Sequence, residues 1–197
     1  LEGFNKWAKA GLKAFASYKA HRFSLRQRLL PLLRWIRHSW FRRSQAFLYH
    51  SDCPRRITLG IDYNKLVVLI AVLEKRCGIP FYPSDVYINA MGGIKLAEPS
   101  VDLAVCAALA SAAADIPIDK YTAVFGEVGL TGEIRAVTYA EKRVNECIKT
   151  GFKTVVLPAK NMKACEKFKG KIKLAPVSYV NQMIKELNLR SPFNPQA

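Results

Sequence analysis

Hydrophobic and polar positions recur along the chain with two different periods, which predict helices and strands from residue 54 onward. Residues 64–78 carry apolar side chains at helical spacing and end at Gly78, a residue that commonly terminates helices. Residues 85–90 alternate apolar and polar positions, which is typical of a strand. Residues 99–114 are apolar on nearly every side and begin at Pro99, so they predict a central, buried helix.

The second half of this region predicts a hairpin followed by alternating helices and strands. Residues 122–128 and 133–137 are predicted strands, with Thr131-Gly132 as the turn between them. The remaining predicted elements are a helix at 139–150 ended by Gly151, a buried strand at 154–157, a helix at 161–168, a strand at 172–174 and a helix at 180–187. Residues 191–197 contain two prolines and are predicted to form a frayed tail. Because helices and strands alternate while one hairpin is local, the predicted fold class is α+β, with mixed α/β layers and a mixed sheet.

Residues 1–53 differ in composition from the rest of the chain. They hold 11 of the 31 Lys and Arg residues, two acidic residues and all three Trp. Within residues 23–49, apolar positions at helical spacing alternate with arginines, which predicts a basic amphipathic helix interrupted at Pro31. Such a helix lies on a membrane surface, fills a partner's groove or contacts nucleic acid. The alternative is an irregular segment or an ordinary helix packed on the domain, and we expect the folded domain to span residues 54–190.

Composition and charge limit the classes of function. The net charge of +16 predicts an acidic partner such as nucleic acid, an anionic membrane or an acidic protein. The five cysteines include no C-x-x-C pair, which favours a reducing, cytoplasmic compartment. No uncharged apolar run approaches the roughly 18 residues of a membrane span, and no glycine-rich phosphate motif occurs. We therefore expect no metal, nucleotide or other cofactor in this chain. Its first residue is Leu, so we expect a fragment or a frameshifted product.

Four ordered blocks, at residues 60–78, 88–105, 125–137 and 141–158, carry a family resemblance. The second and third are INAMGGIKLAEPSVDLAV and FGEVGLTGEIRAV. Together the four blocks resemble the C-terminal, Lon-protease-like domain of the RadA/Sms DNA repair family, and these two are also similar to the Lon peptidase domain. The resemblance covers residues 54–187 and implies a Lon peptidase-like fold, of the ribosomal protein S5 domain 2-like type. Residues 1–53 match no part of it.

The resemblance also locates a peptidase site. Lon peptidases pair a serine nucleophile with a lysine that accepts its proton. Ser100, within Glu98-Pro99-Ser100-Val101-Asp102, matches the nucleophile position, whereas the lysine position falls on Glu141, a carboxylate. Lys142 directly follows Glu141, but one step along a helix turns its side chain in another direction. Lys95 lies five residues before Ser100, and nothing in the sequence brings the two together. We therefore expect no catalytic residues, with Ser100 as a helix N-terminal residue; the alternative is a Ser-Lys peptidase using Ser100 and another lysine.

The RadA resemblance implies a role in DNA repair and recombination instead. Intact members are DNA-dependent ATPases that process recombination intermediates and promote branch migration, and their Lon-like domain forms a hexameric ring that contributes to double-stranded DNA binding. ATP, Mg and Zn are expected only upstream of this domain, and branched DNA and a recombinase are further implied partners. The candidate DNA-binding residues are Arg55, Arg56, Lys65, Lys75, Arg76, Lys95 and Arg135.

Glu127 and Glu133 flank the predicted hairpin and form a second candidate site. Paired carboxylates serve acid–base or metal chemistry in many enzymes. The alternative is that both are ordinary exposed positions of a hairpin, and no histidine near them supports a metal site.

Overall fold

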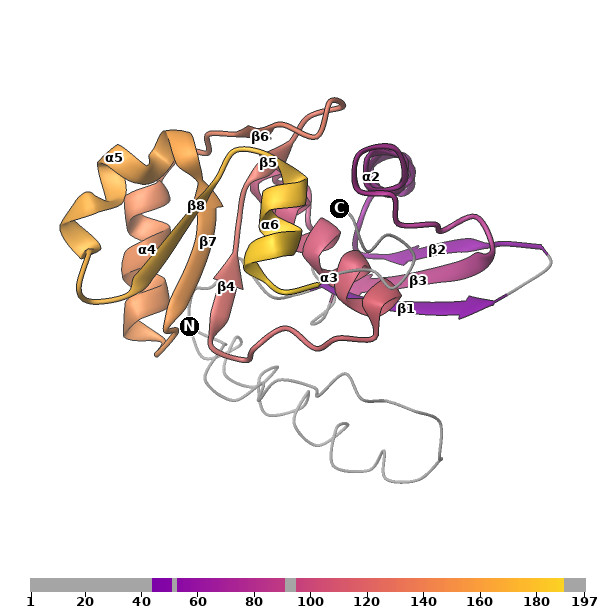
Figure 1. Cartoon of the computed structure of the whole chain (residues 1–197), viewed down its shortest axis with the longest axis horizontal. Coiled ribbons are helices and arrows are strands. Elements are labelled where there is room, and N and C mark those ends of the chain that lie inside the picture. Colours follow the sequence, from indigo (N-terminus) through magenta and orange to yellow (C-terminus); the bar gives the residue numbers. More distant parts are fainter. Residues whose placement is uncertain (1–43, 51–52, 91–94, 190–197) are drawn as a thin grey trace, which may run out of the picture.

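The computed structural model describes residues 44–50, 53–90 and 95–189. In these residues two three-stranded sheets and a short hairpin form the framework. Figure 1 shows one sheet with α2 and α3 on the right, the other with α4 and α5 on the left, and the hairpin at the top between them. The predicted α+β class is confirmed.

The first sheet contains β1 (Ser44–His50), β2 (Arg56–Leu59) and β3 (Ser84–Ala90) in the order β1-β3-β2. β1 pairs antiparallel with β3 while β2 pairs parallel with it, so the sheet is mixed, as predicted. Between β2 and β3 runs α2 (Tyr63–Cys77), where Asp62 accepts a hydrogen bond from the backbone N–H of Lys65. Gly78 ends the helix in the left-handed conformation, with φ of 65°.

The helix α3 (Asp102–Ala114) occupies the centre of the fold. It follows a single 3-10 turn, η2 (Pro99–Val101), and contacts β1, α2 and α6 (Val180–Glu186). Leu103, Cys106 and Leu109 are fully buried within it. A helix packed on several sides needs apolar residues around most of its circumference, and this explains the continuous Ala-rich sequence.

The second sheet consists of β4 (Thr122–Val124), β7 (Thr154–Pro158) and β8 (Lys173–Val177), all parallel, in the order β4-β7-β8. Val155 and Leu157 pack in a cluster with α4 (Ala140–Lys149) and α5 (Met162–Cys165), whereas Val156 joins the larger core that includes α3 and α6. The sheet is therefore buried on both faces, and this accounts for the unbroken apolar run of β7.

The hairpin joins β5 (Glu127–Val128) to β6 (Ile134–Arg135), and Gly132 lies in its turn with φ of 82°. The single strand predicted at 122–128 is divided in the structure. The backbone N–H of Gly126 donates to the carbonyl oxygen of Ser100 at 2.8 Å, and the N–H of Leu103 donates to the carbonyl oxygen of Gly126 at 3.0 Å. These bonds draw the chain out of the parallel sheet and onto the start of α3.

Two further predictions differ from the structure. The prediction of a helix at 23–49 is wrong for its last residues, because Ser44–His50 forms β1 and pairs along its whole length with β3. The described fold thus includes residues before the predicted boundary at 54, while residues 1–43 lie outside the described part. The helix predicted at 161–168 is divided into α5 and two flanking 3-10 turns. No helix in the described residues is long and apolar enough to cross a bilayer.

Candidate functional site

Ser100 lies in the 3-10 turn that leads into α3, and it is 2% exposed. Its backbone carbonyl oxygen accepts the hydrogen bond from Gly126, so the main chain at this point is fixed. Its hydroxyl is buried and has no hydrogen-bond partner among the described residues. A serine becomes a nucleophile only when a base lies within hydrogen-bond reach of its hydroxyl. The geometry therefore supplies no activating group for Ser100.

The residue of α4 that reaches the Ser100 segment is Arg143. Its guanidinium forms an ion pair with Glu98, two residues before Ser100, and its Nε donates to the carbonyl oxygen of Thr138 at 3.1 Å. The Arg143 side chain is only 8% exposed, and burial lowers its pKa from the ordinary value. An arginine nevertheless remains charged in proteins and cannot act as a general base.

Glu141, the residue that the resemblance places at the peptidase lysine position, has a partner of its own. Its carboxylate pairs with Lys167, and both side chains are substantially exposed. Residues two apart on a helix point in different directions, so Glu141 and Arg143 cannot serve the same site. Lys142 also points elsewhere, with its Nζ 4.8 Å from the centre of the exposed Tyr139 ring. Among these three residues of α4, Arg143 is the one that contacts the Ser100 segment, through Glu98, while Glu141 and Lys142 contact Lys167 and Tyr139.

A second ion pair involves Asp102, two residues after Ser100 in the sequence. The Nζ of Lys65 in α2 is 2.7 Å from Oδ1 of Asp102, whose side chain is only 5% exposed. Burial raises the pKa of Asp102, and the hydrogen bond and charge of Lys65 oppose this shift. Since Lys65 is engaged with this carboxylate, it is not an unpaired amine beside the serine. The pair joins α2 to the start of α3.

The two hairpin carboxylates share a single arginine. Arg135 contacts Oε1 of Glu127 at 3.3 Å and Oε1 of Glu133 at 2.8 Å. The pKa of Glu133 is lowered to about 2, first by the hydrogen bond from the Thr131 hydroxyl and also by Arg135. A carboxylate with so low a pKa stays ionised near neutral pH and is a poor proton donor. The arrangement stabilises the turn and gives no support to acid–base chemistry at this site.

Three of the seven residues predicted to bind DNA have partners within the chain. Arg56 donates to the carbonyl oxygens of Ser84 at 2.6 Å and Phe81 at 2.9 Å, and so fixes the segment before β3. Lys65 and Arg135 form the ion pairs described above. These contacts within the chain account for the positions of the three side chains without any ligand.

The other four candidates are Arg55, Lys75, Arg76 and Lys95, and all four are exposed. No carboxylate lies within ion-pair distance of them among the described residues. Lys75 and Arg76 belong to the last turn of α2, where a positive charge is favourable, and Arg76 also packs beside Gly132 of the hairpin turn. These residues stay candidates for contacts with an acidic partner.

The sequence did not single out one basic group, which we call the Tyr121 cluster: Lys120, Tyr121 and Lys153. Lys120 and Tyr121 directly precede β4, and Lys153 directly precedes the adjacent strand β7. Both lysine Nζ atoms lie close to the Tyr121 ring, at 4.9 Å and 4.8 Å from its centre. In the sequence, the Tyr121 cluster is marked only by a lysine just before each of two buried apolar runs. The sequence does not show that these runs are neighbours, because β4 and β7 are far apart along the chain.

Comparisons with known proteins agree with the described geometry. The Lon protease (S16) C-terminal proteolytic domain matches residues 75–190. The DNA repair protein RadA of Streptococcus pyogenes serotype M3 is 44% identical over 131 residues, which cover 66% of this chain and 29% of that protein. RadA of Bacillus subtilis is 46% identical over 117 residues (59% and 26%), and RadA of Pseudomonas aeruginosa is 46% identical over 112 residues (57% and 25%).

The chain spans less than a third of the length of these relatives. The match to the peptidase domain covers more than half of the chain, and within it the buried Ser100 hydroxyl has no hydrogen-bond partner among the described residues. The chain therefore belongs to the RadA family of DNA repair proteins, through a domain of the Lon protease C-terminal type.

Proposed function

We propose that this domain is a non-proteolytic module that binds duplex DNA and assembles with copies of itself within a RadA-type DNA repair protein. The observation that carries the non-proteolytic part is the Ser100 region: a buried hydroxyl without a base, between two ion pairs. A buried charge that is already paired is costly to separate, so neither Arg143 nor Lys65 is available to reorganise around a substrate.

The DNA-binding part is supported by charge. The chain carries +16, and four of its exposed candidates have no acidic partner among the described residues. Lys and Arg side chains that contact phosphates give affinity that does not depend on sequence and that falls as salt rises. The relatives are named DNA repair proteins, which fits such a role.

The proposal extends to the cellular setting. A domain acting on the chromosome belongs in the bacterial cytoplasm, and its own role needs no metal or nucleotide. ATP, Mg and Zn belong, in this proposal, to parts of the relatives beyond the matched segment, and so does the motor that drives branch migration. A hexameric ring and contact with a recombinase are further parts of the same proposal.

A fluorescence-anisotropy titration of the chain with a labelled 30-base-pair duplex tests DNA binding. We expect binding whose logarithmic dissociation constant rises linearly with the logarithm of the salt concentration. The variant Lys75→Ala/Arg76→Ala is expected to lower the slope by about 2. Sedimentation velocity at increasing protein concentration tests assembly. A chain that shows no salt-dependent binding and stays a monomer would contradict the proposal, and a branched duplex in parallel shows which DNA structure is preferred.

Peptidase activity is tested with a fluorogenic peptide mixture and the Ser100→Ala variant. We expect both proteins to hydrolyse peptide at the same background rate, because no side chain of the described residues lies within hydrogen-bond distance of the Ser100 hydroxyl. Hydrolysis that disappears in Ser100→Ala would establish the serine as a nucleophile. Circular dichroism of the variant shows whether it is folded, and a small change is expected because the substitution removes a single buried hydroxyl.

A further inference from the structure

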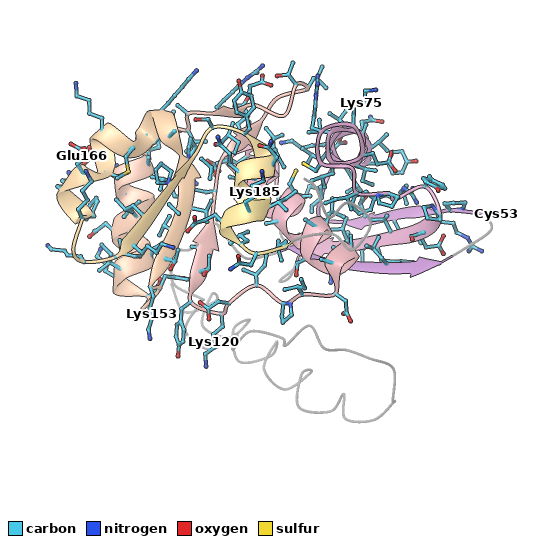
Figure 2. All side chains as sticks on the ribbon, viewed as in Figure 1. Cys53, Lys75, Lys120, Lys153, Glu166 and Lys185 are labelled. Carbon is cyan, nitrogen blue, oxygen red and sulfur yellow. The ribbon has the colours of Figure 1, made fainter. Side chains whose placement is uncertain are left out.

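The Tyr121 cluster lies at the edge of the parallel sheet where the strands begin. Because β4, β7 and β8 run in the same direction, the residues that precede them meet at one edge. Figure 2 shows the labelled Lys120 and Lys153 side chains close together at the lower end of this sheet, pointing away from it. The labelled Lys75 lies at the opposite, upper part of the same view. The cluster is thus separate from the predicted basic residues of α2.

The backbone holds the cluster in place. The N–H of Lys153 donates to the carbonyl oxygen of Tyr121 at 2.8 Å, and the N–H of Thr154 donates to the same oxygen at 3.1 Å. On the other side, the N–H of Lys173 donates to the carbonyl oxygen of Lys153 at 2.9 Å. These bonds continue the pairing of the sheet by one residue. The backbone of Tyr121 and Lys153 is therefore fixed, which lowers the entropy lost when the cluster binds a ligand.

The charge of the cluster is not neutralised within the described residues. Lys120 and Lys153 have no carboxylate within ion-pair distance, whereas Lys173, at the same edge, pairs with Glu186 at 2.6 Å. Asp119 is the acidic residue next to the cluster in sequence. Its Oδ2 accepts hydrogen bonds from the backbone N–H of Tyr121 at 2.9 Å and from the Thr122 hydroxyl at 3.3 Å, so it caps the start of β4.

Both ammonium groups lie near the same aromatic ring. Since each Nζ is within 5 Å of the ring centre, the two charges are no more than about 10 Å apart. The two charges repel, and salt at physiological strength, with a screening length of about 8 Å, reduces this repulsion. The ring face attracts each cation, and this holds the two near each other without a counterion. An anion placed between them would relieve the repulsion.

We propose that the Tyr121 cluster is a contact site for the phosphate backbone of duplex DNA, with Lys120 and Lys153 each binding a phosphate and the Tyr121 ring positioning the two ammonium groups. Lys120 and Lys153 come from two segments that precede adjacent strands, so each can contact a different phosphate of a polyanion. The site contributes affinity but no sequence preference. This inference rests on the proposed DNA-binding function and adds a second contact surface to it.

The experiment compares three forms of the full chain in the anisotropy titration. The variant Lys120→Ala/Lys153→Ala is expected to bind about ten-fold more weakly near physiological salt and to lower the salt slope by about 2. The matched control Lys160→Ala/Lys163→Ala removes the same charge from two exposed lysines around α5. We expect it to keep the slope of the unmodified chain. Tyr121→Leu is expected to weaken binding while the slope changes by less than 1, because both phosphate contacts remain.

The outcomes separate this inference from the proposed function. If the unmodified chain binds DNA and the Lys120→Ala/Lys153→Ala variant has the same affinity and slope, the Tyr121 cluster is not a contact site and the proposed function stands. Equal losses in this variant and in Lys160→Ala/Lys163→Ala would also overturn the inference, because only total charge would matter. If the unmodified chain does not bind DNA, both fail. Displacement by poly-glutamate as effective as by DNA of equal charge would assign the cluster to an acidic protein and overturn the inference.

Discussion

The Ser100 region and the Tyr121 cluster both gather charged residues from distant parts of the chain, but they treat the charges in opposite ways. Around Ser100, Arg143 pairs with Glu98 and Lys65 pairs with Asp102, and Arg143 and Asp102 are buried. In the Tyr121 cluster two exposed lysines share a tyrosine ring and have no acidic partner among the described residues. Basic side chains thus stabilise the fold around Ser100, whereas in the Tyr121 cluster they are available to a partner.

The difference follows from the cost of removing charge from water. A buried ion that loses its partner costs several kcal/mol, so charges at the centre of the fold must be paired. An exposed lysine stays solvated and needs no partner for stability. Around Ser100, the position that resembles a peptidase nucleophile, the charged side chains therefore form ion pairs that stabilise the fold. This comparison is open to direct test by substitution.

The largest expected effect comes from breaking the Arg143–Glu98 pair. Glu98→Gln keeps the shape of the side chain but removes the carboxylate charge, so it leaves the buried Arg143 guanidinium without its counter-charge. We expect a loss of about 3 kcal/mol in the free energy of unfolding, measured by urea denaturation. The control is Lys167→Met, which breaks the exposed pair with Glu141 and should cost less than about 0.5 kcal/mol. Equal losses in the two variants would contradict the distinction drawn here.

A smaller, pH-dependent effect is expected at Asp102. Its pKa in the folded protein is raised above 3.8, so folding favours the protonated form, and the chain loses stability as pH rises from 3.8 through the raised pKa. Asp102→Asn has no such titration and resembles the protonated form. We expect the variant to match the unmodified chain below pH 3.8 and to be the more stable of the two at pH 7. Urea denaturation across this pH range measures both.

Lys65→Met provides the opposite test of the same ion pair. It leaves the Asp102 carboxylate buried without a cation, and we expect it to destabilise the fold by about 2 kcal/mol at pH 7. A variant Asp102→Asn that is less stable than the unmodified chain at pH 7 would show that the attraction of Lys65 outweighs the cost of burial.

The smallest effect is expected at the Tyr121 cluster itself. Lys120→Ala/Lys153→Ala removes two exposed charges that make no ion pair among the described residues, so the free energy of unfolding should change by less than about 0.5 kcal/mol. The same variant is the one expected to bind DNA more weakly. Thermal unfolding followed by circular dichroism measures the change, and a large loss of stability would show that the cluster holds the sheet edge together.

Much of the fold could be predicted from local pattern. The helix ending at Gly78, the central helix after Pro99 and the strand of β7 all carry strong periodicity and end signals within a few residues. The strand Ser44–His50 could not be predicted in this way, because the arginine-rich sequence before it continues the pattern of an amphipathic helix up to residue 49. Its conformation follows from pairing with β3, about 40 residues later in the sequence.

The candidate site was predicted in part. Ser100 and the lack of a lysine partner follow from the sequence and the family resemblance. The resemblance assigned the lysine position to Glu141, and the structure adds that Arg143 of the same helix pairs with Glu98 while Glu141 pairs with Lys167. A shift of two positions on a helix changes the direction of the side chain by roughly 200°, so only the packing of α4 could distinguish them.

By itself, the sequence determined the order of the elements, most of the apolar core and the serine without its lysine, because each depends on residue type or on neighbours within one or two turns. The tertiary structure decided which charges are paired. Glu98 and Arg143 are 45 residues apart, and Tyr121 and Lys153 meet only because β4 and β7 pair. Contacts between residues so far apart in the sequence depend on how whole elements pack, so the local sequence pattern does not predict them.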